Sequence, residues 1–88
     1  MTRSRRQQLW DRLAAGDLRN VSLVEFRRLI ESFGFGLRRV SGSYYIYTHP
    51  QVPRPLRLQP RNREAKPYQI SQFLDTVREF GLTIEHRQ

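Results

Sequence analysis

The stretch RRVSGSYYIYTHP, residues 38–50, decides the fold of this 88-residue chain. It predicts a β-hairpin, because a tight Gly42-Ser43 turn separates two runs of strand-forming residues. We expect the first strand over residues 35–40 and the second over residues 44–49, where tyrosine and other β-formers are concentrated. Side chains along the second strand alternate between two faces. One face carries Tyr44, Ile46 and Thr48, and the other carries Tyr45, Tyr47 and His49.

A short helix is expected near the N-terminus. It begins at Ser4, with Gln7 at the spacing of a capping box, and it ends at Gly16. Its apolar face includes Trp10. We expect Trp10 to anchor the helix to the core rather than to stack on bases, and likewise Tyr45 and Tyr47 to pack in the sheet.

A second helix precedes the hairpin and is more strongly specified. Ser22 and Glu25 form a capping box, and an apolar stripe then runs up to Gly34, which ends the helix. Arg27 and Arg28 leave on its polar side. They are either a solvated face or part of a binding surface, and the sequence leaves both interpretations open.

Proline shapes the segment after the hairpin. Residues 50–55 contain three prolines, and we expect a loop there because proline cannot donate to a central strand. A short third strand follows over residues 56–59, and then a polar, basic loop over residues 60–65. The last helix opens at Lys66-Pro67, since proline suits the first helical position. Residues 82–84 have the alternation of a short edge strand.

The predicted order α-α-β-β-β-α indicates an α+β fold with one three-stranded antiparallel sheet backed by helices. Without the first helix, the order α-β-β-β-α is that of a double-stranded-RNA-binding domain. We therefore expect a helical N-terminal extension over residues 1–20, a double-stranded-RNA-binding-like domain over residues 21–85, and a tail over residues 86–88.

The charge balance points to nucleic acid. The chain has 16 basic and 8 acidic residues, a formal net charge of +8 and a sequence pI of about 11.3. Every basic residue except Lys66 is arginine, whose flat guanidinium suits phosphates and stacks on bases. An acidic protein would also be attracted to such a surface, so charge alone does not separate the two kinds of partner.

Several classes of function are excluded by composition. The chain has no cysteine, which rules out disulfides, thiolate zinc sites and a cysteine nucleophile. No apolar run approaches the ~18 residues of a membrane span, and no apolar segment of a signal peptide follows the basic N-terminus. No carboxylate pair has the spacing of a metal site. We expect a cytoplasmic protein without membrane partner, metal or small-molecule cofactor.

Four short motifs, in this order and at this spacing, resemble the HicA toxins of bacterial type II toxin–antitoxin systems. They are FRRLIESFGF (26–35), RVSGS (39–43), IYTHP (46–50) and KPYQI (66–70). The resemblance spans about residues 21–82, and the N-terminal segment resembles an extended branch of the family. It implies a fold like that of double-stranded-RNA-binding domains and a ribosome-independent mRNA endoribonuclease, or mRNA interferase. It also implies neutralisation by a HicB-type antitoxin.

Tyr44 departs from the family pattern, in which a histidine taken to be catalytic follows the Gly-Ser turn. Metal-free RNA cleavage needs a base for the 2′-OH proton and an acid for the leaving 5′-oxygen. Imidazole serves because its ordinary pKa is near ~6.5, whereas a tyrosine hydroxyl ordinarily titrates near ~10 and is a poor base. With Tyr44 at the catalytic position we expect cleavage to be impaired. Whether Tyr44 is natural or an engineered inactivating change stays open.

The other histidines do not replace it. His49 lies on the opposite face of the strand, about 16 Å from Tyr44 by strand rise, and we expect a structural residue at the strand end. His86 lies in the tail.

The RNA-binding surface is expected around the hairpin, the basic loop and the start of the last helix. The residues expected to form it are Arg38, Arg39, Gly42, Ser43, Arg61, Arg63 and Lys66. The backbone N–H groups of Tyr68 and Gln69 are further donors for a phosphate, because a helix N-terminus favours anions. Two alternatives stay open: a non-catalytic RNA-binding module, and a small protein-interaction domain with an acidic partner.

Overall fold

The computed structural model describes residues 4–59 and 63–85. Over these residues the chain forms the following elements, in order: α1 (Arg5–Ala14), α2 (Leu23–Ser32), β1 (Gly36–Ser41), β2 (Tyr44–His49), β3 (Val52–Leu58) and α3 (Pro67–Phe80). The strands form one antiparallel sheet in the order β1-β2-β3. The predicted α+β class and the three-stranded antiparallel sheet are confirmed.

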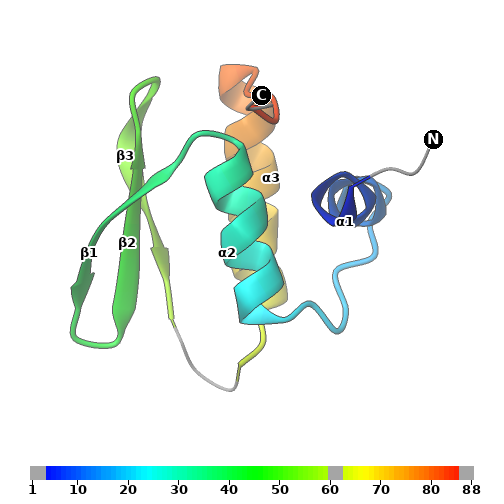
Figure 1. The fold of residues 1–88 in the computed structure, drawn as a ribbon, viewed down its shortest axis with the longest axis horizontal. Helices are drawn as coiled ribbons and strands as arrows, with labels where there is room; N and C mark the ends of the chain where they lie inside the picture. Colours follow the sequence, from blue (N-terminus) through cyan, green and yellow to red (C-terminus); the bar gives the residue numbers. More distant parts are fainter. Residues whose placement is uncertain (1–3, 60–62, 86–88) are drawn as a thin grey trace.

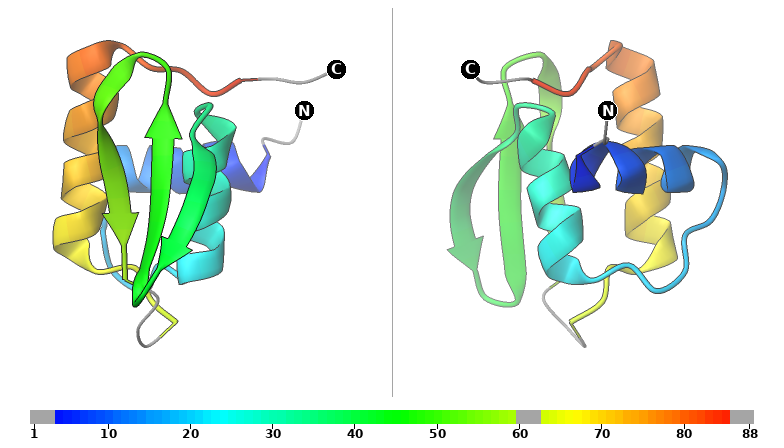
Figure 2. Two further views of the ribbon diagram at one scale, coloured as in Figure 1. Left: turned by 90° about the vertical axis from the view of Figure 1, so that its left-hand side faces the viewer. Right: turned by 45° about the vertical axis from the view of Figure 1, so that its right-hand side comes forward.

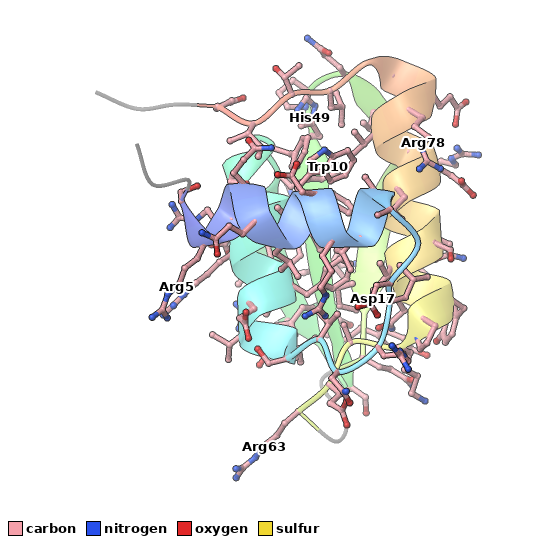
Figure 3. All side chains as sticks on the ribbon, turned by 90° about the vertical axis from the view of Figure 1, so that its right-hand side faces the viewer. Arg5, Trp10, Asp17, His49, Arg63 and Arg78 are labelled. Atoms are coloured by element: carbon pink, nitrogen blue, oxygen red, sulfur yellow. The ribbon has the colours of Figure 1, made fainter. Side chains whose placement is uncertain are left out.

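The elements are stacked in three layers (Figure 1). The sheet is the first layer, α2 and α3 cover one of its faces, and α1 lies on the far side of these two helices. Figure 3 shows α1 crossing both of them. Figure 2 (left) looks onto the opposite face of the sheet, which no described element covers. We call it the outer face.

Phe73 on α3 lies at the centre of the core, with no exposed surface. Its ring meets those of Phe26, Phe33, Phe35 and Trp10 at angles of 62–87°, with centroid distances of 5.5, 5.4, 6.1 and 6.4 Å. Trp10 also lies 5.0 Å from Phe33. Aromatic pairs in such tilted and edge-to-face arrangements are favourable beyond the area they bury. The prediction that Trp10 anchors the first helix to the core is confirmed.

The first two helices begin at their predicted caps. Ser4 Oγ accepts a hydrogen bond from the N–H of Gln7 (3.1 Å), but the Gln7 side chain donates to Asp11 (3.0 Å), so only half of that capping box forms. Ser22 Oγ accepts from the N–H of Glu25 (3.0 Å), and its hydroxyl donates to the Glu25 carboxylate (3.1 Å). These bonds satisfy N–H groups that the helices leave unpaired at their starts.

The hairpin is confirmed, with two adjustments. Its two-residue loop has φ = +56° at Gly42, which suits the glycine-first turn that matches strand twist. The first strand begins one residue later than predicted, because Phe35 is turned into the core and is only 3% exposed. The pairing register also shifts between Leu37 and Arg39, which leaves Arg38 as an extra residue in a bulge.

The expected loop is confirmed for residues 50–51 but wrong for residues 52–55, because β3 already begins at Val52 and contains both Pro53 and Pro55. β3 lies at the edge of the sheet. An edge strand uses only half of its N–H groups for pairing, so it tolerates proline where a central strand does not. Leu56 and Leu58 point into the core, with 8% and 1% of their surfaces exposed.

Residues 82–84 form no strand, and that expectation is also wrong. Leu82 donates a backbone hydrogen bond to Val77 (3.0 Å), and Glu85 donates one to Ser32 (2.6 Å). The segment therefore donates hydrogen bonds to carbonyl groups near the C-terminal ends of α3 and α2. Its alternation reflects burial of Leu82 against the helices rather than pairing with a strand.

Candidate nucleic-acid interface

The sheet region carries positive charge only. Residues 32–63 include all three strands and contain no Asp or Glu, and every one of the eight carboxylate residues lies outside this range. The same range has six arginines: Arg38, Arg39, Arg54, Arg57, Arg61 and Arg63. The basic surplus of the chain is therefore concentrated in the sheet and its adjoining loops.

Of the four arginines on the strands, three have no ion-pair partner among the described residues. Arg54 pairs with Glu79 on α3 at 3.2 Å. Arg38, Arg39 and Arg57 are exposed, and none of them forms an ion pair with a residue that the structure describes. An unpaired, exposed guanidinium is available for phosphate binding without first breaking an internal bond.

Several predicted binding residues meet at one end of the molecule, which we call the hairpin end. The Gly42-Ser43 turn lies there, together with the first turns of α2 and α3 (Figure 2). Arg63 and Lys66 lie in the segment that leads into α3, and Arg63 points away from the body of the protein (Figure 3). Arg61 lies outside the described residues. The hairpin end thus brings the Gly42-Ser43 turn together with two basic residues of the segment before α3.

Arg63 is held by hydrogen bonds to the start of α2. Its backbone has φ = +57°, a conformation that residues other than glycine rarely adopt. Its carbonyl accepts from the N–H of Leu23 at 2.9 Å, and Ala65 donates to the carbonyl of Val21 at 2.9 Å. These bonds fix the loop against α2 and compensate for the unfavourable backbone conformation.

The start of α3 offers fewer donors than predicted. Lys66 is the N-cap residue and makes no side-chain cap. The N–H of Gln69 donates to the carbonyl of Lys66 at 3.0 Å, so it is occupied within the helix. The prediction that Gln69 supplies a free N–H for phosphate is therefore wrong. The N–H of Tyr68 has no partner among the described residues.

On the outer face, one row of side chains joins all three strands. Arg39 pairs with Ile46 across β1 and β2, and Ile46 pairs with Arg57 across β2 and β3. Directly paired residues project from the same face of a sheet. Tyr47, which follows Ile46, is fully buried under the helices, so Ile46 and its neighbours in the row face solvent. The bulge takes Arg38 out of this row.

Tyr44 belongs to the outer face as well. It pairs with Ser41 beside the turn, and 41% of its surface is exposed. Its hydroxyl has no hydrogen-bond partner among the described residues. No histidine or carboxylate occurs in the paired strand β1 or in the turn, so neither supplies Tyr44 with a base.

His49 has a structural role, as predicted. The N–H of Gln51 donates to its Nδ1 at 3.0 Å, so Nδ1 carries no proton. Nε2 then carries the proton and donates to the carbonyl of Phe33 at 3.0 Å. The ring also lies 4.9 Å from that of Phe35. Both nitrogens of His49 are occupied, and it lies on the opposite face of β2 from Tyr44. His86 is outside the described residues.

Arg27 makes contacts that the sequence did not predict. Its Nε donates to the hydroxyl of Tyr47 at 2.8 Å, and its guanidinium lies 4.1 Å from the centre of the Tyr45 ring. Tyr47 in turn donates to Glu31 at 2.8 Å. The hydrogen bond to Tyr47 raises the pKa of Arg27, and burial raises the pKa of Tyr47. The four-residue spacing of Arg27 and Glu31 on one helix face was the available signal.

This network supports the predicted packing role of both tyrosines. Tyr47 is fully buried, and Tyr45 is half-buried against the core beneath the Arg27 guanidinium. Neither ring is presented on the outer face. Arg27 is therefore a link between α2 and the sheet rather than a solvated charge.

A hollow of about 650 Å³ lies away from the hairpin end, between α1, α2 and the start of β1. Its lining includes Arg6 and Arg28 together with Glu31 and Glu85, so the charges in it are mixed. It contains none of the predicted binding residues. The hollow and the basic sheet are distinct features of the molecule.

Among residues 4–59 and 63–85, no group of three or more His, Asp or Glu side chains is placed to hold a metal ion. None of the helices in the described part of the chain has the length and apolar character that a membrane span requires. No protein-family model, curated protein or solved structure matches the chain.

Proposed function

We propose that this chain is an RNA-binding toxin of the HicA type, acting on mRNA in the cytoplasm, with Tyr44 at the catalytic position. The observation that carries the proposal is the absence of any carboxylate from residues 32–63, together with the unpaired arginines on the strands. The order of α2, the sheet and α3 is compatible with a fold like that of double-stranded-RNA-binding domains.

Phosphate binding supplies the affinity in this proposal. Arg38 and Arg39 lie on β1, and Arg63 and Lys66 lie in the segment that leads into α3, at the same end of the molecule as the Gly42-Ser43 turn. The turn itself is open, since no atom lies within 4 Å of the position that a Cβ would take at Gly42. Each phosphate contact releases condensed counterions, so binding is expected to weaken steeply with salt.

Cleavage is expected to be impaired in this chain. Transfer of the 2′-OH proton requires a base within hydrogen-bond reach, and the only titratable group of the hairpin turn is the phenol of Tyr44. His49 is engaged through both of its nitrogens. The absence of a free base near Tyr44 also supports a second candidate, a non-catalytic RNA-binding module. The following experiment separates this module from a toxin whose catalytic position is altered.

RNA cleavage and growth arrest are measured for the unaltered chain, Tyr44→His and Tyr44→Phe. Gain of both activities in Tyr44→His supports a toxin whose catalytic position is altered. If neither variant cleaves but all bind RNA with a steep salt dependence, the chain is a non-catalytic module. Cleavage by the unaltered chain that Tyr44→Phe abolishes would contradict the proposed impairment.

The proposal includes a HicB-type antitoxin as protein partner. An antitoxin that neutralises the chain by covering its basic surface needs complementary acidic groups. RNA and antitoxin would then compete. Co-purification of the chain with the product of the neighbouring reading frame, and release of RNA on its addition, are the expected results.

A further inference from the structure

We infer that the outer face of the sheet, along the row Arg39–Ile46–Arg57, binds single-stranded RNA with Tyr44 as a stacking platform. This inference rests on the proposed RNA-binding function and names the substrate class and the surface. It adds Ile46 and Arg57 to the residues predicted from the sequence.

The face is open and carries no negative charge. All three helices lie on the opposite side of the sheet (Figure 1). Arg39 and Arg57 flank the half-buried Ile46 in one row, and their positions lie two strand spacings apart, roughly 10 Å. Arg39 and Arg57 can therefore each bind one phosphate of an extended RNA strand, with the apolar side chain of Ile46 between them.

Tyr44 adds a contact that only unpaired bases can use. It lies two residues from Ile46 on the same face, about 6.6 Å along the strand, and 41% of its surface is exposed. A base exposes its flat face to an aromatic ring only when it is not stacked inside a duplex. A duplex would meet this surface through its phosphates alone. Tyr44 thus favours a single strand over a double strand.

An acidic protein is the rival occupant, since it would use the same arginines. Tyrosine also contributes to protein–protein interfaces, so loss of affinity for one ligand on removal of the Tyr44 ring does not separate the two occupants. A loss that affects single-stranded RNA and spares duplex RNA does, because stacking of an unpaired base on an aromatic side chain typically contributes about 1–3 kcal/mol.

The test uses the full chain and fluorescence anisotropy with two labelled probes, a single-stranded RNA without self-complementarity and an RNA duplex of the same length. The variants are Arg57→Ser, Tyr44→Leu and the control Arg78→Ser. Arg78 is an exposed arginine on α3, away from the sheet (Figure 3). Circular dichroism establishes that each variant is folded.

We expect Arg57→Ser to weaken single-strand binding about 5- to 10-fold and to reduce the salt slope by about 0.7, as for one lost phosphate contact. Tyr44→Leu should weaken binding of the single strand at least about 5-fold and leave the duplex unchanged. Arg78→Ser should weaken the binding of either probe only as much as the loss of one positive charge from the whole protein does.

The experiment distinguishes failure of the proposed RNA-binding function from failure of the inference about the outer face. If the unaltered chain binds no RNA, the proposed function fails together with the inference. If it binds RNA but Arg57→Ser behaves like Arg78→Ser, the outer face is not the binding surface and only the inference is overturned. Equal effects of Tyr44→Leu on both probes would overturn the preference for a single strand.

Discussion

The hydroxyl of Tyr47 on β2 donates a 2.8 Å hydrogen bond to the carboxylate of Glu31 on α2. The same hydroxyl accepts a 2.8 Å bond from Arg27. One buried phenol oxygen therefore satisfies a carboxylate and a guanidinium at once, and it ties the helix layer to the sheet. Removal of the hydroxyl breaks two hydrogen bonds to charged groups, one to the partly buried Arg27 and one to the exposed Glu31.

We expect Tyr47→Phe to lower the free energy of unfolding by about 1–3 kcal/mol at neutral pH, because Arg27 and Glu31 each lose a partner. Chemical denaturation followed by circular dichroism measures the change. Tyr68→Phe is the matched control, since Tyr68 is 56% exposed. An equal effect of the two substitutions would contradict the role given to the Tyr47 hydroxyl.

The difference in stability between the unaltered chain and Tyr47→Phe should depend on pH. Burial raises the pKa of Tyr47, so the folded state keeps a proton that the unfolded state releases above about pH 10. The stabilisation is complete below that pH and declines as the pH rises through the folded-state pKa. The advantage of the unaltered chain over Tyr47→Phe should therefore shrink above about pH 10. A constant difference would contradict this linkage.

Phe73→Ala is expected to cost about 3–5 kcal/mol, because the ring is fully buried among four other aromatic rings. A chain of this length has a total stability of roughly 4–13 kcal/mol. The variant should therefore lose between about a quarter and all of its stability, while Phe73→Leu should cost about 1–2 kcal/mol. Denaturant midpoints of both variants check the prediction, and a loss below about 1 kcal/mol for Phe73→Ala would refute it.

Gly34 and Gly16 provide a matched comparison of backbone strain and packing. Their φ values are similar, +95° and +98°, so alanine is strained at both. At Gly16 a Cβ meets open space, whereas at Gly34 it would collide with the Glu85 carboxylate and approach His49 Nε2. The exposed Glu85 side chain can turn away, but His49 Nε2 is held by its hydrogen bond to the Phe33 carbonyl. Gly34→Ala should therefore destabilise by up to about 1 kcal/mol more than Gly16→Ala. A smaller loss for Gly34→Ala than for Gly16→Ala in urea denaturation would contradict this prediction.

The first helix should unfold together with the rest of the domain. Leu13 on α1 has no exposed surface, and Leu13→Ala should cost about 2–4 kcal/mol. Ala14→Ser, at an exposed position of the same helix, should change stability by less than about 0.5 kcal/mol. Trp10 is the sole tryptophan, so its fluorescence reports on α1. A fluorescence transition at lower denaturant than that of circular dichroism would show that α1 is independent.

Lys66→Gln should weaken RNA binding to a similar degree for different RNA sequences and lower the salt slope by about 0.7–0.9, as expected for a phosphate contact. Arg78→Gln on α3 is the control. Anisotropy titrations at several salt concentrations provide the slopes. A change in sequence preference without a change in slope would assign Lys66 to base recognition instead.

Local features of the fold were predictable from the residues that form them. The capping box at Ser22, the turn at Gly42 and the start of α3 at Pro67 each depend on interactions within about four positions of the chain. Such interactions are present whatever the rest of the molecule does. The hairpin strands and the three helices were found for this reason.

Strand pairing at the sheet edge was not predictable in the same way. Pro53 and Pro55 disfavour a central strand, and they are tolerated because β3 lies at the edge of the sheet and its pairing with β2 is irregular between Val52 and Leu56. Residues 82–84 alternate like a strand but close the ends of two helices. Whether a segment becomes an edge strand, a central strand or a segment packed against helix ends depends on neighbours that are distant in the sequence.

For the candidate site as well, some features followed from the sequence and others only from the tertiary structure. Composition and motif order by themselves determined that the chain is basic, that its arginines gather around a hairpin, and that Tyr44 stands where the resembling family has a histidine. Only the tertiary structure decided that Arg39, Ile46 and Arg57 form one row and that Arg27 turns inward to Tyr47. The physical reason is that charge and local conformation belong to single residues and their neighbours. A surface, in contrast, depends on strand register and helix packing between segments far apart in the chain.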